Sequence, residues 1–137
     1  MTVYAEDLQP GMTDSFTRTV TARDVELFAE ATGDTNPLHL DEDYGRTTVF
    51  GGRIAHGALT VSYLSAVFGT KLPGPGAIVL KLTTRFGGQV RIGDTVTAIC
   101  TVRRRLPRRC FLFDCVCKVG DVTVVEGEAL IMAPARP

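Results

Sequence analysis

The chain has 137 residues, of which 45% are apolar, enough for the core of one domain but not of two. Its 15 basic and 15 acidic residues balance, which argues against a broad nucleic-acid-binding surface. The apolar-rich stretch 58–68 is too short to cross a bilayer, and Glu6 and Asp7 argue against a signal peptide. We therefore expect a cytoplasmic protein that binds neither nucleic acid nor membrane.

Cysteine is confined to the C-terminal third of the chain, at positions Cys100, Cys110, Cys115 and Cys117. These positions lie in stretches that alternate like strands, so Cys115 and Cys117 should point to one face of a sheet. There is no Cys-x-x-Cys pair, and both histidines are far away in sequence. We therefore expect no metal site, and we expect free thiols that pack as small apolar groups.

The N-terminal part of the chain predicts a short strand over 16–20 followed by an amphipathic helix over 22–32. Thr21 has the features of the helix N-cap, and Asp24 follows it at the spacing of a capping box. Gly33 is a typical residue for the end of such a helix.

A loop of nearly twenty residues is predicted from Gly33 to about Gly52, and loops of this length in compact domains tend to be functional. Pro37 is expected to exclude a helix within it, while Asp41 could cap a single helical turn. A second helix is predicted over 57–68. It is apolar on nearly every side, so we expect protein to surround it completely.

The remainder of the chain is strand-like. Strands are predicted over 77–86, 95–103, 110–119 and 122–132, with Gly120 and Asp121 as a two-residue hairpin turn. The order of strand, helix, long loop, apolar helix and four strands predicts an α+β fold. In this fold an antiparallel sheet wraps around a central helix.

The only two histidines lie in or beside the long loop. His39 follows Asp34 by five residues, and a folded-back loop could bring the carboxylate and the imidazole to one small molecule. Such a pair can hold a water molecule, with one group taking its proton while the other orients it. Asn36 lies between them and could fix either group. On its own, however, an Asp-x-Asn-Pro segment is more often a turn with an Asx hydrogen bond.

A second cluster, Ile54–Ala58, opens the apolar helix. The first amide N–H groups of a helix are unpaired and carry partial positive charge. Directed at a carbonyl oxygen, these groups could stabilise an enolate, and Gly57 would let a ligand approach closely because it has no side chain. The alternative is that Gly57 is a packing residue and His56 a satisfied core group.

These residues belong to a longer pattern, made of 32–41 (TGDTNPLHLD), 54–57 (IAHG) and 92–96 (IGDTV), with Tyr44 and Thr47 between the first two segments. The pattern resembles the hydratase-2 motif of the MaoC-like, (R)-specific enoyl-CoA hydratases of the hotdog superfamily. The resemblance runs over roughly residues 10 to 132 and implies a single hotdog domain over residues 1–137.

The resemblance implies that Asp34 and His39 form a catalytic dyad that activates one water molecule. Hydroxide would add to C3 and a proton to C2 on the same face, converting trans-2-enoyl-CoA to (R)-3-hydroxyacyl-CoA. The amide of Gly57 would hold the thioester oxygen, and Asn36 and Ser65 would have supporting roles. This chemistry needs neither a metal ion nor a redox cofactor.

Further expectations concern the pocket and the oligomer. His56, Tyr63 and Phe68 are candidate substrate contacts, although Tyr63 and Phe68 also fit a plain core role. Departures from the family pattern at 80–82 and 87–89 would alter the acyl pocket and thus the preferred chain length. Because a free sheet edge is a liability, we expect a homodimer with a continuous sheet.

Other activities remain open at this point. A 3-hydroxyacyl-[acyl carrier protein] dehydratase would run the same chemistry backwards. The basic residues between Arg103 and Arg109 could bind CoA phosphates or an acidic carrier, or could simply be the solvated tip of a hairpin. The spacing of Asp34 and His39 argues against a thioesterase. Their presence also argues against a non-catalytic acyl-CoA-binding subunit.

Overall fold

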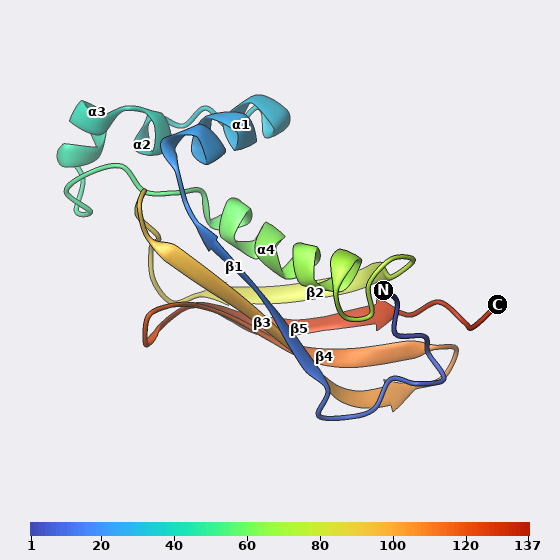
Figure 1. Cartoon of the computed structure of the whole chain (residues 1–137). Helices are drawn as coiled ribbons and strands as arrows, with labels where there is room; N and C mark the ends of the chain where they lie inside the picture. Colours follow the sequence, from blue (N-terminus) through green and yellow to red (C-terminus); the bar gives the residue numbers. More distant parts are fainter.

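The computed structural model describes residues 1–137. Its elements are β1 (Thr13–Thr19), α1 (Ala22–Thr32), α2 (Pro37–Leu40), α3 (Glu42–Arg46), α4 (Gly57–Thr70), β2 (Ile78–Phe86), β3 (Thr95–Leu106), β4 (Cys110–Val119) and β5 (Val122–Met132). The strands form one antiparallel sheet in the order β1-β3-β4-β5-β2. Helix α4 lies across one face of this sheet, and α1, α2 and α3 gather at one end (Figure 1). The predicted α+β architecture is confirmed.

Helix α1 has the predicted bounds because both of its ends are determined locally. The hydroxyl of Thr21 accepts a hydrogen bond from the backbone N–H of Asp24, and the carboxylate of Asp24 accepts one from the backbone N–H of Thr21. Gly33 ends the helix in the left-handed conformation (φ 82°), where a side chain would be strained. The chain therefore turns sharply just before Asp34.

The prediction that Pro37 excludes a helix is wrong, because α2 begins at Pro37 and carries His39. Proline is tolerated at the first helical position, where the backbone N–H has no intrahelical partner. The side-chain oxygen of Asn36 caps this short helix. The next turn, α3, begins after Asp41, whose carboxylate caps it as predicted.

Helix α4 covers the sheet with only one of its faces. The buried face carries Thr60, Tyr63, Leu64, Val67 and Phe68. The opposite face is exposed and carries small side chains, Ala58, Ser62, Ser65 and Gly69. The expectation that protein surrounds the whole helix is therefore wrong for a single chain, since the sheet covers just one side. None of the helices is long and apolar enough to span a membrane.

The core lies between α4 and the inner face of the sheet, where alternate residues of β3 and β4 are buried together with Val124, Val125, Ala129 and Ile131 of β5. Strands β4 and β5 have the predicted bounds, and the predicted hairpin turn joins them at Gly120. Cys100, Cys115 and Cys117 are free thiols inside this core, as predicted, whereas Cys110 is half-buried. The two sheet edges are β1 and β2.

Candidate active site

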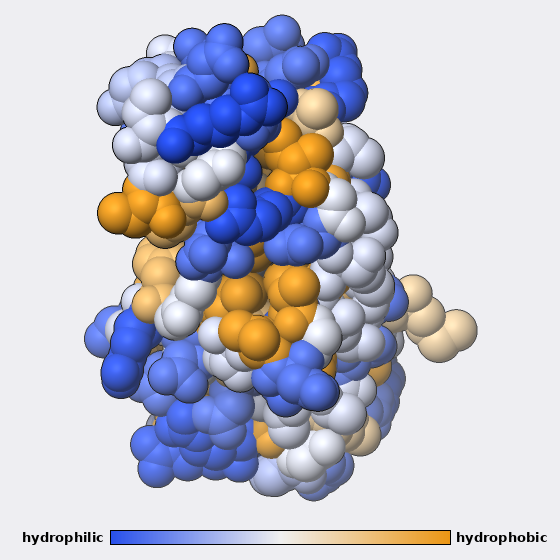
Figure 2. All heavy atoms as spheres, turned by 90° about the vertical axis from the view of Figure 1, so that its left-hand side faces the viewer, coloured by the Kyte–Doolittle hydropathy of each residue, from blue (hydrophilic) through white to orange (hydrophobic).

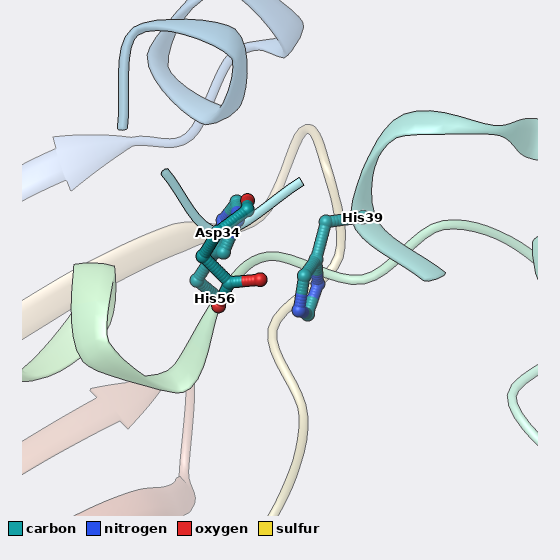
Figure 3. Close-up of side chains that lie close together, drawn as sticks. All are labelled: Asp34, His39 and His56. Atoms are coloured by element: carbon teal, nitrogen blue, oxygen red, sulfur yellow. The ribbon is translucent and has the colours of Figure 1, made fainter. Parts of the chain in front are cut away.

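Asp34, His39 and His56 meet near the start of α4, although they come from three separate segments. One carboxylate oxygen of Asp34 and one ring nitrogen from each histidine all lie within 4.8 Å of one another. Figure 3 shows the three side chains grouped together, with Asp34 between the viewer and His56 and with His39 beside them. The turn after α1 supplies Asp34, α2 supplies His39, and the residue before α4 is His56.

The imidazole of His39 is held in one tautomer. Its Nδ1 lies 2.8 Å from the backbone carbonyl oxygen of Ile54. Because a carbonyl oxygen can only accept, Nδ1 carries the hydrogen and Nε2 keeps a free lone pair. Arg53 donates from Nε to the backbone carbonyl of His39 at 2.8 Å, which ties α2 to the same segment. The ring therefore presents a proton acceptor at a fixed place.

The carboxylate of Asp34 is exposed, and one of its oxygens takes part in a turn. Its Oδ1 accepts a hydrogen bond from the backbone N–H of Asn36 at 3.3 Å. The side-chain oxygen of Asn36 instead accepts from the backbone N–H of Leu38. The Asx turn is thus present, and it orients the same carboxylate that lies beside His39. Asn36 contributes through its main chain and as a helix cap.

His56 is enclosed more completely than His39, with exposed fractions of 1% and 8%. Its Nε2 lies 3.0 Å from the backbone oxygen of Asp34, and its Nδ1 is buried without a hydrogen-bond partner. The two imidazole rings stack with centroids 3.9 Å apart and planes 31° apart. This enclosure leaves little of His56 for the substrate contact expected from the sequence.

A mostly apolar cavity of about 340 Å³ opens beside the start of α4. Gly57 and Thr60 line it together with Phe50, Ile54 and Phe86. A Cβ on Gly57 would lie 2.6 Å from the ring of Phe86, so glycine lets the cavity reach the helix start. No side chain caps α4, which leaves its first backbone N–H groups free of a side-chain acceptor. Viewed from this end, apolar side chains lie exposed between hydrophilic ones (Figure 2).

Three other residues that the sequence predicted for the site lie away from Asp34 and His39 in the single chain. Ser65 is on the exposed face of α4, and Phe68 is buried edge-to-face against Phe113 with ring centroids 5.2 Å apart. Tyr63 lines a different cavity, of about 360 Å³, between β1, α1 and α4. Its hydroxyl is buried without a partner, and burial raises the pKa of Tyr63.

The basic residues of the β3–β4 hairpin lie at the opposite end of the sheet from α2 (Figure 1). Arg103 forms ion pairs with Asp114 and Glu128, and the hydrogen bond that Arg103 donates to Asp114 raises the pKa of Arg103. Arg105 donates to the carbonyl of Ala5 at 2.5 Å. These contacts and their position favour the hairpin interpretation over a role beside Asp34 and His39.

Two contributors to the site were not anticipated from the sequence. The carbonyl of Ile54 fixes the tautomer of His39, and Arg53 fixes its main chain. A backbone acceptor leaves no trace in residue type, because every residue has a carbonyl. The only available signal for Arg53 was its position directly before the Ile54–Gly57 segment.

Comparison with known proteins places this geometry in a family. A family model described as "MaoC like domain" matches residues 7–109. The chain belongs to the MaoC-like family. A relative from Rhodospirillum rubrum, named (R)-specific enoyl-CoA hydratase, is 49% identical over 134 residues, which cover 97% of this chain and 93% of the relative. A Methylorubrum extorquens relative, named 3-hydroxybutyryl-CoA dehydratase, is 46% identical and covers 98% of this chain and 86% of its own length.

Solved structures agree with the family assignment. The unliganded R-hydratase PhaJ1 from Pseudomonas aeruginosa matches with a TM-score of 0.95 and 39% identity, covering 98% of this chain and 88% of that one. The (R)-hydratase from A. caviae matches with a TM-score of 0.91 and 34% identity, covering 94% and 99%. The MaoC-like chain therefore has the predicted hotdog fold.

Proposed function

We propose that this MaoC-like protein is an (R)-specific enoyl-CoA hydratase, which adds water syn across trans-2-enoyl-CoA to give (R)-3-hydroxyacyl-CoA. The single observation that carries the proposal is the convergence of Asp34 and His39 next to the Gly57-lined cavity. The names of the relatives from Rhodospirillum rubrum and Methylorubrum extorquens support it.

The spacing of the two side chains suits one shared water molecule. Two polar atoms up to 4.8 Å apart can both hydrogen-bond to a water placed between them, since each bond spans about 2.8 Å. The free lone pair of His39 Nε2 takes the water proton, and the carboxylate of Asp34 polarises the water and relays the proton. A C3–O bond forms, and the proton is delivered to C2 on the same face.

Negative charge moves onto the thioester oxygen while hydroxide adds to C3. The backbone N–H of Gly57, at the positive end of α4, stabilises that oxygen in the proposed mechanism. The apolar wall of the cavity accommodates the acyl portion and excludes water, which strengthens this electrostatic interaction. The residues of the chain supply the base, the dipole and the water site, so the reaction requires no cofactor.

The experiment that tests the activity is hydration of crotonyl-CoA by the purified protein, followed by the loss of enoyl absorbance. The product is then resolved into its (R) and (S) forms. The proposal predicts turnover with (R)-3-hydroxybutyryl-CoA as the product. No turnover on C4, C6, C8 or C12 enoyl-CoAs, or an (S) product, would contradict it.

A 3-hydroxyacyl-[acyl carrier protein] dehydratase is the second candidate, because the same dyad runs the reaction in reverse. An Arabidopsis thaliana relative with that name is 28% identical over 123 residues. Crotonyl groups presented on CoA and on acyl carrier protein separate the two candidates. We expect the higher kcat/KM with CoA, because the relatives that are 49% and 46% identical to this chain are both named for CoA substrates.

We also propose that the protein is a homodimer. Edge strand β2 exposes Ile78, Val79, Leu80 and Phe86, and the outward face of α4 is lined by small side chains. A second copy paired along β2 would extend the sheet and cover this face, and it would place Ser65 in the interface. Light scattering should give twice 14.8 kDa, and a monomer would contradict the proposal. The proposal includes a cytoplasmic location, which cell fractionation tests.

A further inference from the structure

His56 lies directly before α4, but its side chain does not cap this helix. It is the N-cap residue of α4, with φ −60° and ψ 133°, and it makes no side-chain cap hydrogen bond. Ser, Thr, Asp and Asn are preferred at N-caps because their oxygens accept from the first backbone N–H groups. An imidazole here breaks a local rule, and such departures concentrate at functional sites.

The side chain of His56 is directed to the main chain of Asp34 instead. Its Nε2 lies 3.0 Å from the carbonyl oxygen of Asp34, so Nε2 carries the hydrogen and donates it. Its Nδ1 is left buried and unpaired, which is costly for a polar atom. The bond fixes the residue whose carboxylate orients the water.

The face of the same ring restrains His39. The ring centroids of His39 and His56 are 3.9 Å apart, and the ring centroid of Phe28 in α1 lies 4.8 Å from that of His56. The hydrogen bond from His39 to Ile54 alone would let the His39 ring swing about that bond. The face of His56 blocks this rotation on one side, which limits the directions that His39 Nε2 can take (Figure 3).

We infer that His56 is a positioning residue that ties Asp34 and His39 to each other through one imidazole, without itself contacting the substrate. This inference rests on the proposed hydratase function.

Two substitutions separate the two contacts. His56→Phe keeps a ring against His39 and removes the N–H donated to Asp34, whereas His56→Gln keeps an N–H donor and removes the ring. Each should lower kcat for crotonyl-CoA by about tenfold or more, since small displacements of reacting groups are costly, while KM stays within about twofold. An unchanged kcat in both variants, or a raised KM at unchanged kcat, would overturn the inference.

The control is Val67→Ala, which removes a fully buried side chain from the same helix away from the site. It should lower the midpoint of thermal unfolding without changing kcat. A second control adds His56→Phe to the Asp34→Asn variant. If His56 acts through Asp34 and His39, the double variant should be little slower than Asp34→Asn alone. If the losses in kcat of the two single variants multiply in the double variant, His56 acts independently of Asp34, and the inference is overturned.

A measurement without turnover distinguishes this inference from the proposed function. The chain has only two histidines, so nitrogen-15 spectra of the imidazole rings contain two sets of signals. We expect the hydrogen of His39 on Nδ1 and that of His56 on Nε2, and we expect the His39 signals to shift in His56→Phe. A His56 hydrogen on Nδ1, or unshifted His39 signals, would overturn the inference. An inactive wild type with the expected spectra would overturn the proposed function alone.

Discussion

The hydrogen on Nδ1 of His39 is donated to the backbone carbonyl of Ile54, two residues before His56 and across a loop of more than a dozen residues. This bond holds the four-residue helix α2, and with it the proposed general base, in a fixed position. The carbonyl belongs to the segment that leads into α4, so the base and the helix start are positioned together. Their relative placement does not depend on the flexibility of the loop between them.

Substitutions of His39 distinguish the structural role of its hydrogen bond to Ile54 from the role of its ring as a base. An asparagine amide at position 39 can donate to Ile54 from about the place of Nδ1 but has no proton acceptor at the place of Nε2. We expect His39→Asn to unfold within a few degrees of wild type and to lose about a hundredfold or more in kcat. His39→Ala should in addition lose about 1–3 kcal/mol of stability, because the carbonyl of Ile54 is left unpaired. Thermal unfolding and crotonyl-CoA kinetics check both values, and wild-type kcat in His39→Asn would be inconsistent with a basic His39.

Gly57 is predicted to be intolerant of even one extra methyl group. Its Cβ would lie 2.6 Å from the ring of Phe86, which must then move at the cavity wall. We expect Gly57→Ala to lower kcat/KM by about tenfold or more through a displaced oxyanion contact. Adding Phe86→Ala should restore part of the rate if the clash is the cause. If kcat/KM does not recover in the double variant, the clash with Phe86 is not the cause, and the loss comes from a change at the start of α4 itself.

Stability should fall at alkaline pH. Burial raises the pKa of Cys117 to about 12 from its ordinary value of 9.0, and the hydrogen bond with Cys115 together with burial raises the pKa of Cys100. The folded state therefore binds these protons more tightly than the unfolded state. The stabilisation is fully present below pH 9 and is lost as the pH rises toward 12.

Urea unfolding between pH 7 and pH 11 measures this effect. We expect the free energy of unfolding to be level up to about pH 8.5 and to decline above pH 9. Cys117→Ala should lower stability at every pH because of the cavity, yet it should flatten the decline. A free energy of unfolding that stays level up to pH 11 would contradict the buried-thiol explanation.

Metal chelation should have no effect on turnover. Asp34, His39 and His56 each bring one possible ligand atom to within 4.8 Å of the others. In the proposed mechanism, however, the free lone pair of His39 takes the water proton, so it is not available to a metal ion. Incubation with EDTA followed by desalting should leave kcat for crotonyl-CoA unchanged. Loss of activity that added Zn²⁺ restores would require a metal-dependent mechanism.

Much of the fold could be predicted because its signals are local. Thr21, Asp24 and Gly33 fix the ends of α1 through contacts within a few residues, and the alternation of buried residues marks β4. The helical state of Pro37 was missed because proline is excluded from helix interiors but not from helix starts. The exposed face of α4 was missed because small side chains such as Ala58 look apolar in sequence while nothing in one chain covers them.

The candidate site was predictable in residue type but not in detail. The motif containing Asp34 and His39 identified the pair, yet the tautomer of His39 depends on a carbonyl, and the stacking of His56 depends on the packing of three segments. Both are long-range contacts between loop backbone and side chains. No spacing rule in the sequence encodes them.

The most direct test compares two aspartates of the same region. Asp34→Asn keeps the shape of the side chain and its turn but removes the charge beside His39. Asp43→Asn makes the same change on α3, where the side chain is 93% exposed. With crotonyl-CoA, we predict that Asp34→Asn lowers kcat by about a hundredfold or more while Asp43→Asn matches wild type. An Asp34→Asn protein that hydrates crotonyl-CoA at the wild-type rate would contradict the assignment of Asp34 and His39 as the water-activating pair.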